Sequence, residues 1–189
     1  MPTIGVLALQ GAFAEHEKTL RGLGVDVRRV TLPEHLDGLA GLIIPGGEST
    51  TIGKLLVEWK LLEPIRVRAG DDLPVMGSCA GMIVMAADVG RDQPRLGIMD
   101  IVVERNAFGR QVDSFETPLQ IPALGEEPFP CVFIRAPRIV TIGPDVTPLA
   151  TLDDGTVVAA EQGKHVAVSF HAELTPDSRL HRYFLERTR

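Results

Sequence analysis

The sequence predicts a single α/β domain, with a mostly parallel central sheet flanked by helices and with antiparallel strands in its C-terminal half. Continuous apolar runs at residues 3–9 and 39–44 are typical of strands that are covered on both faces. Helix-compatible segments alternate with these runs, which favours a parallel arrangement. After Gly97, strand-like segments are separated by turns instead of helices. A chain of 189 residues is long enough to bury a substantial core, so we expect one domain over residues 1–189.

The N-terminal half alternates strands and helices. Pro45-Gly46-Gly47 breaks the second apolar run, and Gly24 closes the first helical segment. A later strand, 73–76, leads directly into a helical stretch. The elements expected in this half are strands at 3–9, 25–30, 39–44 and 73–76, and helices at 12–23, from Thr50 through Trp59, and at 82–88.

The C-terminal half is rich in short strands, which we interpret as an antiparallel insertion in the sheet or an extension of it. Asp153-Asp154-Gly155 and Gln162-Gly163-Lys164 are hairpin turn signals. Thr175-Pro176-Asp177 opens a C-terminal helix, with proline at the first helical position. Residues 118–130 are too irregular to assign. The strands expected here are 98–104, 111–115, 131–134, 139–142, 157–160 and 165–170.

Composition excludes several function classes. The net charge of −6, without a basic run, argues against a nucleic-acid partner. No apolar stretch is long enough to span a membrane, and the first residues lack a cleavable leader pattern. The two cysteines, Cys79 and Cys131, form neither a CxxC pair nor a metal-ligand spacing, so we expect no metal site and a reduced, cytoplasmic protein. Cys131 lies in an apolar strand and is expected to be a core residue.

The segment Gly77-Ser-Cys-Ala-Gly81 is the strongest chemical signal in the chain. It follows an apolar strand and precedes a helix, which is the context of a nucleophile elbow, with Cys79 as the nucleophile. Glycines at 77 and 81 relieve crowding at such a turn. The N-terminus of the following helix favours thiolate over thiol. The five residues alone are equally compatible with a buried cysteine between two turn glycines, so a base and an oxyanion site must be found elsewhere.

His171 is the candidate base. It is the one histidine of five that ends an apolar strand with a carboxylate, Glu173, two residues later. In an extended chain residues i and i+2 share a face, so Glu173 can orient the imidazole. A nucleophile, a base and an orienting group need not be neighbours in sequence. A lone His-x-Glu is also common at a solvated strand end, and only its combination with Cys79 favours a triad.

An oxyanion site requires backbone N–H groups that point at the developing negative charge. The amide of Ala80, directly after Cys79, is one candidate. Gly46-Gly47 is the other, because glycine permits close approach of the backbone to a ligand. Pro-Gly-Gly is also a good turn in its own right. Polar residues after it, beginning with Glu48, place a carboxylate and hydroxyls at the mouth of the same loop.

At this point the sequence resembles a known family. Pro45-Gly-Gly-Glu-Ser-Thr-Thr51, Gly77-Ser-Cys-Ala-Gly81 and His171-Ala-Glu-Leu174 resemble motifs of the class I (triad-type) glutamine amidotransferases. The blocks 7–11, 103–116 and 132–137 narrow the resemblance to the glutaminase subunit of pyridoxal 5′-phosphate synthase. The resemblance covers essentially the whole chain, and block 103–116 is its most specific part.

The resemblance implies a class I glutamine amidotransferase-like fold and hydrolysis of L-glutamine to L-glutamate and ammonia. The ammonia would pass to a synthase subunit, which we expect to activate the glutaminase. No cofactor is implied. The matching positions imply a triad of Cys79, His171 and Glu173; an oxyanion hole at Gly47 and Ala80; glutamine contacts at Gly47, Glu48, Ser49, Arg105, Ile134 and Arg135; and a partner-sensitive Gln10.

One residue departs from the family pattern, and two other functions stay open. Ala172 stands where the family usually has proline between the triad histidine and glutamate. Proline stiffens such a turn but supplies no reacting group, so we expect the chemistry to be retained. The alternatives are a triad glutaminase that serves another acceptor, and a non-catalytic regulatory subunit on the same fold.

Overall fold

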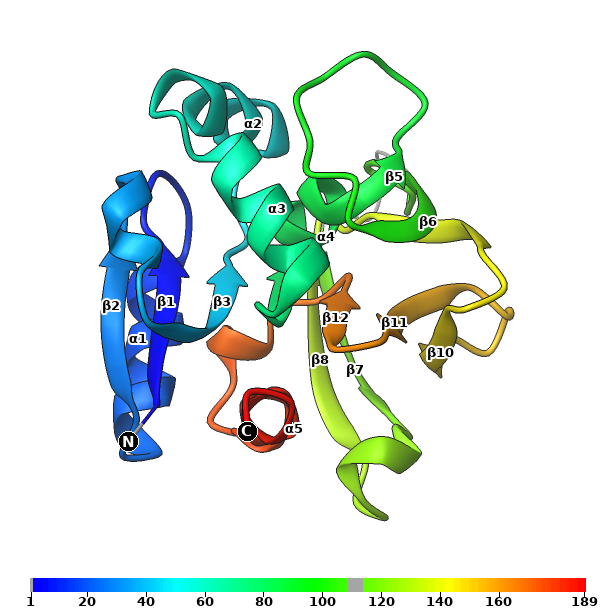
Figure 1. Ribbon diagram of the computed structural model, residues 1–189. Helices are drawn as coiled ribbons and strands as arrows, with labels where there is room; N and C mark the ends of the chain where they lie inside the picture. The colour runs from blue at the N-terminus through cyan, green and yellow to red at the C-terminus, as the bar shows by residue number, and fades with distance from the viewer. Residues whose placement is uncertain (1, 109–113) are drawn as a thin grey trace.

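The computed structural model describes residues 2–108 and 114–189, and it contains a large mixed sheet with helices on both faces (Figure 1). The strand order is β2-β1-β3-β4-β12-β11-β9-β6-β5, with β10 paired to β11. In this order, the strands from β2 to β12 are all parallel to their neighbours. Parallel neighbours need crossover connections, which here contain a helical segment or run through the C-terminal half of the chain. Its strands are β1 (Thr3–Leu7), β2 (Asp26–Val30), β3 (Leu39–Ile44), β4 (Val75–Ser78) and β12 (His165–Val168).

The remaining half of the sheet is mainly antiparallel, as the turn-rich sequence predicts. Here β11 pairs antiparallel with β12, β9 and β10, and β6 pairs antiparallel with β9. A separate antiparallel ribbon of β7 and β8 projects from this half (Figure 1). The strands are β5 (Ala86–Asp88), β6 (Met99–Glu104), β7 (Ser114–Leu119), β8 (Phe129–Ile134), β9 (Arg138–Ile142), β10 (Thr147–Thr151) and β11 (Val157–Gln162).

Two hydrophobic clusters pack on opposite faces of the sheet. Along β12, Val166 and Val168 enter one cluster and Ala167 enters the other, which is the alternation that a doubly covered strand requires. One cluster holds Ile52 of α2, and the other holds Phe184 of α5. The helices are α1 (Phe13–Gly22), α2 (Ser49–Glu58), α3 (Leu62–Asp71), α4 (Ala80–Met85) and α5 (Arg179–Glu186), and the 3₁₀ turns are η1 (Pro33–Leu36), η2 (Pro122–Leu124) and η3 (Ala172–Leu174). Within the described ranges, no helix combines the length and apolar character needed to cross a membrane.

The fold class is confirmed, whereas several element boundaries differ from the prediction. The helix expected at 82–88 is α4, which ends at Met85 because residues 86–88 pair with β6 as strand β5. The C-terminal helix begins at Arg179, not at Pro176, since the Asp177 carboxylate accepts the Arg179 N–H at 3.0 Å and so holds the chain outside the helix. Of the strand expected at 111–115, residues 111–113 lie outside the described residues, and β7 continues to Leu119. Helix α3 and strand β10 were not predicted.

Candidate active site

Cys79 lies on the sharp turn between β4 and α4, as the elbow motif predicts. Its backbone has φ 51° and ψ −106°, a left-handed conformation that is rare for a side-chain-bearing residue. The Cys79 amide donates to the Val168 carbonyl of β12 at 2.8 Å, which anchors the turn to the neighbouring strand. The side chain is 7% exposed, and its Sγ lies 3.9 Å from the Ile134 carbonyl oxygen. Strain of this kind is characteristic of functional turns and aims the sulfur into a cavity.

Close packing explains why glycine flanks Cys79. A Cβ on Gly81 would lie 2.1 Å from the Ile44 carbonyl oxygen at the end of β3. A Cβ on Gly77 would lie 2.5 Å from the Met85 sulfur and 2.6 Å from the Gly81 carbonyl carbon. Because Gly81 faces backbone that cannot move away cheaply, the turn requires glycine for close approach between elements.

His171 and Glu173 form a buried pair beside Cys79. His171 Nδ1 and Glu173 Oε1 are 2.6 Å apart, and the two residues are 8% and 6% exposed. The sequence argument assumed an extended chain, and in this respect it was wrong. His171 (φ −92°, ψ 87°) leads into the 3₁₀ turn η3, so the turn and not strand alternation directs Glu173 back to the imidazole.

The protonation of this pair follows from its contacts. Burial by itself would lower the pKa of His171, but hydrogen bonds with Cys79 and Glu173, together with their charges, raise it to about 10. Burial would raise the pKa of Glu173, yet the hydrogen bond with His171 and the positive charge of that imidazolium hold it below its ordinary value. These contacts therefore favour an imidazolium at His171 beside the Glu173 carboxylate.

His171 and Cys79 open into a cavity of about 480 Å³. The residues that the sequence predicts to bind glutamine, to form the oxyanion hole or to respond to the partner all line this cavity. Glu173 lies behind His171, outside this lining. The lining comprises Gln10, Gly11, Ala12, Gly46, Gly47, Glu48, Ser49, Cys79, Ala80, Ile83, Arg105, Asn106, Ile134, Arg135 and His171.

The loop that follows β3 is held against the chain after β1. The Ala12 amide donates to the Gly46 carbonyl at 2.9 Å, and the Glu48 amide donates to Gln10 Oε1 at 2.8 Å. A Cβ on Gly46 would lie 2.3 Å from Cε1 of His171, so the imidazole packs directly on this glycine. Gln10 thus connects the first strand's loop to the Gly46-Gly47 loop.

Glu48 and Arg105 form a polar wall at the mouth of the cavity. Glu48 caps α2, accepting from the amides of Thr50 (3.0 Å) and Thr51 (2.7 Å). Partial burial would raise the pKa of Glu48, but hydrogen bonds from the Thr51 hydroxyl and from the amides of Thr50 and Thr51 lower it to about 2. Arg105 donates to the Glu48 carboxylate at 3.2 Å and to Gln93 at 3.1 Å. The guanidinium therefore reaches the cavity already oriented.

The opposite wall comes from the end of β8. Ile134 is the last residue of that strand, and its carbonyl faces the Cys79 sulfur. Arg135 follows with φ 44°, a left-handed conformation that ends the strand. Both residues line the cavity, and the family resemblance predicts that both contact glutamine.

Sequence reasoning missed several polar residues near the site. Gln93 is 5% exposed and joins Arg105 to the Ser49 hydroxyl, which it reaches at 3.3 Å. His16 and His181 are fully buried behind Glu173. No local pattern marks them, because they come from helices α1 and α5 and meet only in the folded chain. Cys131 is buried as predicted, and burial raises the pKa of its thiol to about 12.

Comparisons with known proteins agree with this geometry. Residues 6–189 match the SNO glutamine amidotransferase family. The chain is 61% identical over 187 residues to the pyridoxal 5′-phosphate synthase subunit PdxT of Herpetosiphon aurantiacus, covering 97% of this chain and 98% of that protein. The subunit of the same name from Moorella thermoacetica is 59% identical over 184 residues, covering 97% of each chain.

The chain is also similar to a solved structure over nearly its whole length. A crystal structure of a glutamine amidotransferase superposes with a TM-score of 0.93 at 50% identity, covering 98% of both chains. The family match and these identities extend over nearly the whole sequence. The chain therefore belongs to the SNO glutamine amidotransferase family.

Proposed function

We propose that this protein hydrolyses L-glutamine to L-glutamate and ammonia, and that the ammonia passes to a synthase subunit for pyridoxal 5′-phosphate formation. The observation that carries the proposal is the His171–Glu173 pair, 2.6 Å apart, beside a strained Cys79 at the wall of one cavity. The acceptor follows from the relatives, which are named as subunits of pyridoxal 5′-phosphate synthase.

In the first half of the reaction the Cys79 thiolate attacks the side-chain carbonyl carbon of glutamine. A sulfur–carbon bond forms, and the amides of Gly47 and Ala80 stabilise the oxyanion. The carbon–nitrogen bond then breaks. Protonated His171 donates its proton to the departing nitrogen, which leaves as ammonia, while Glu173 orients the imidazole.

In the second half, neutral His171 removes a proton from water, which attacks the thioester. The carbon–sulfur bond breaks, glutamate leaves and Cys79 returns as thiolate beside an imidazolium. A histidine whose pKa is raised to about 10 by its partners holds this proton readily in the resting state. No cofactor enters either step.

Substrate recognition uses the charged wall of the cavity. Arg105 or Arg135 can pair with the α-carboxylate of glutamine in a bidentate contact. Glu48 and Ser49 supply polar groups on the Arg105 side, and Ile134 supplies backbone and apolar contact. Because Gln93 and Glu48 already orient Arg105, little side-chain entropy is lost on binding.

Partner binding acts through Gln10. Its side chain accepts the Glu48 amide, so movement of Gln10 changes the conformation of the loop that carries Gly47. We propose that docking of the synthase subunit near Gln10 completes the oxyanion hole. The free protein is then weakly active, and glutamine is not wasted in the absence of an acceptor.

The proposal also covers the extent of the domain and the cellular compartment of the reaction. Residues 1–189 act as one glutamine amidotransferase domain. The reaction takes place in the cytoplasm, where thiols stay reduced. This agrees with free thiols at Cys79 and Cys131.

The test is glutamine hydrolysis by the purified chain, alone and mixed with a pyridoxal 5′-phosphate synthase subunit, with Cys79→Ala as the blank. We expect strong stimulation by the synthase that is absent from the blank. Activity without stimulation would instead indicate another acceptor. Absence of activity in both conditions would indicate a regulatory subunit.

A further inference from the structure

A buried polar cluster lies behind Glu173, on the side away from the cavity that holds Cys79. His16 of α1 is its centre. Its Nε2 lies 3.1 Å from the Ser78 hydroxyl, at the end of β4, and 3.5 Å from Glu173 Oε2. Its Nδ1 lies 2.9 Å from Nε2 of His181 on α5. The cluster thus joins two helices to the strand that carries the nucleophile.

The second oxygen of the Glu173 carboxylate faces this cluster. Oε1 is bonded to His171, whereas Oε2 is buried and has no hydrogen-bond partner. The Glu173 side chain is 0% exposed, so solvent does not reach it. His16 Nε2 is the group that faces Oε2. A buried carboxylate oxygen without a donor is costly, and His16 Nε2, 3.5 Å away, is positioned to supply one.

The chemistry of the groups fixes the direction of the hydrogen bonds. A carboxylate oxygen only accepts, so His16 must carry its proton on Nε2 to serve Oε2. Neutral His16 then accepts at Nδ1 from Nε2–H of His181. That leaves His181 Nδ1 unprotonated, and this atom is buried without a hydrogen-bond partner. Burial lowers the pKa of His16, and it lowers that of His181 to about 3, so both imidazoles are neutral.

We propose that His16 is a positioning residue for the triad: its Nε2–H, set by His181 and Ser78, holds the second carboxylate oxygen of Glu173. The inference rests on the proposed function, because it assumes that Glu173 orients the catalytic imidazole. His16 touches none of the reacting atoms and acts through the groups that it contacts, Glu173 above all. It is not among the residues that line the glutamine cavity.

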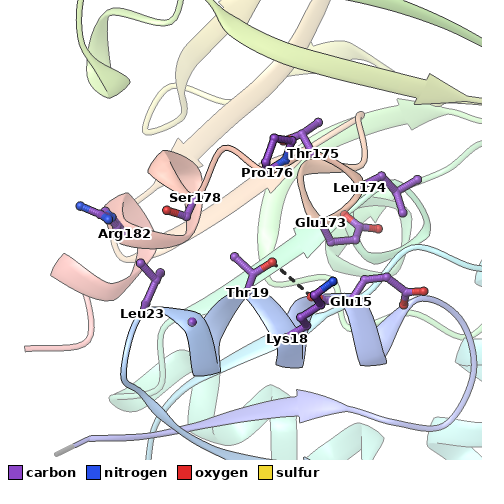
Figure 2. A pocket seen from close by; sticks show the side chains of 11 residues that line it. Glu15, Lys18, Thr19, Leu23, Glu173, Leu174, Thr175, Pro176, Ser178 and Arg182 are labelled. Carbon is purple, nitrogen blue, oxygen red and sulfur yellow. Dashed lines mark hydrogen bonds between the residues drawn. The ribbon is translucent and has the colours of Figure 1, made fainter.

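Figure 2 shows the other side of Glu173, where a cavity of about 630 Å³ separates α1 from the segment that leads into α5. Glu173 is among the residues that line this cavity, yet its side chain is shielded from solvent. Several titratable groups on each packed element face the Glu173 region: Glu15, His16 and Lys18 of α1, His181 and Arg182 of α5, and Cys79 and His171 of the triad.

The experiment compares His16→Leu, which removes the donor, with His16→Gln, whose amide can place an N–H near the former Nε2. His165→Leu is the matched control, since His165 is a partly buried histidine at the start of β12 that accepts the Val75 amide at 3.2 Å and, within the described part of the chain, makes no hydrogen bond or ion pair with Glu173. Thermal unfolding establishes that each variant is folded at the assay temperature. The readouts are the pH dependence of glutamine hydrolysis and the downfield NMR resonance of the His171 Nδ1 proton.

For His16→Leu we expect kcat to fall about tenfold with KM nearly unchanged, the loss typical of one hydrogen bond to a charged group. Without a donor at Oε2 the pKa of Glu173 rises, so the acidic limb of the pH profile moves to higher pH by about one unit. The His171 resonance shifts or broadens. His16→Gln restores most of these properties, and His165→Leu keeps all of them.

An unchanged pH profile and resonance in folded His16→Leu would overturn the proposal, as would failure of His16→Gln to restore either. If His16→Leu does not fold, His181→Asn replaces it, and we expect the same direction of change. An unchanged pH profile and an unchanged His171 resonance in folded His181→Asn would then overturn the proposal. The NMR readout does not require turnover. A wild-type protein without glutaminase activity, whose His171 resonance still responds to His16, would refute the proposed function and support the positioning role.

Discussion

Gly46→Ala is the sharpest test of how the fold positions His171. The new Cβ would lie 2.3 Å from Cε1 and 2.8 Å from Nδ1 of the imidazole. Ordinary van der Waals contact begins near 3.4 Å, so the ring must retreat by roughly 1 Å. His171 cannot swing away freely, because Glu173 holds Nδ1 at 2.6 Å. The substitution should therefore displace His171, the proposed catalytic base, while leaving the strands intact.

The expected cost follows from that displacement. A misplacement of about 1 Å in a reacting group can cost about 100-fold in rate, or about 2.7 kcal/mol. The change should appear in kcat, because Gly46 meets His171 and not the charged wall around Arg105. Stability should change little, since the clash involves a side chain at the cavity surface.

The assay is steady-state glutamine hydrolysis in the presence of the synthase subunit, with thermal unfolding measured in parallel. Gly70→Ala is the control, because Gly70 lies in helix α3 with nothing within 4 Å of the added Cβ. It should keep full activity and gain about 1 kcal/mol of stability from helix propensity. A Gly46→Ala variant with kcat within about threefold of wild type would refute the reasoning, because the position of the His171 imidazole would then not limit the rate.

Three further predictions concern the triad and its turn. Glu173→Gln removes the charge that raises the pKa of His171, and we expect kcat to fall at least about 100-fold; a loss below tenfold would contradict an orienting role. Because the folded pKa of His171, about 10, exceeds its ordinary 6.5, its stabilising contribution is complete below pH 6.5 and is lost as the pH rises toward 10. The thermal midpoint should fall across that interval, and less steeply in Glu173→Gln; equal slopes would contradict this assignment. Ala172→Pro should change turnover by less than about tenfold, since Ala172 begins η3, where proline is tolerated; a larger gain would show that alanine loosens the triad.

The parts of the fold that sequence predicts are those with a strong local signal. The run at 39–44 is buried on both faces, and strand β3 occupies those residues. Strand β10 was missed because Pro148 interrupts it and Ala150 is its one well-buried residue. Helix α3 was missed because Pro64 obscures the four-residue spacing of Ile65 and Ala69, although proline is acceptable in a first helical turn.

The residues of the candidate site also fall into two groups, those that a local sequence pattern predicts and those that it does not. Cys79 could be found because the elbow is a contiguous motif, and His171–Glu173 because the pair is nearly so. His16 lies among charged neighbours in the sequence, yet it is fully buried. Its contacts with His181, 165 positions away, form only when α1 and α5 pack on one face of the sheet. No local pattern encodes such an encounter.

The central claim is that Cys79 is the nucleophile of a glutaminase, and covalent trapping tests it most directly. The protein is treated with an electrophilic glutamine analogue, and the modified peptide is mapped by mass spectrometry. We predict a single adduct on Cys79 that excess glutamine suppresses and that Cys131, buried and with its thiol pKa raised to about 12, does not share. An unmodified Cys79, or an adduct that glutamine does not suppress, would contradict the account.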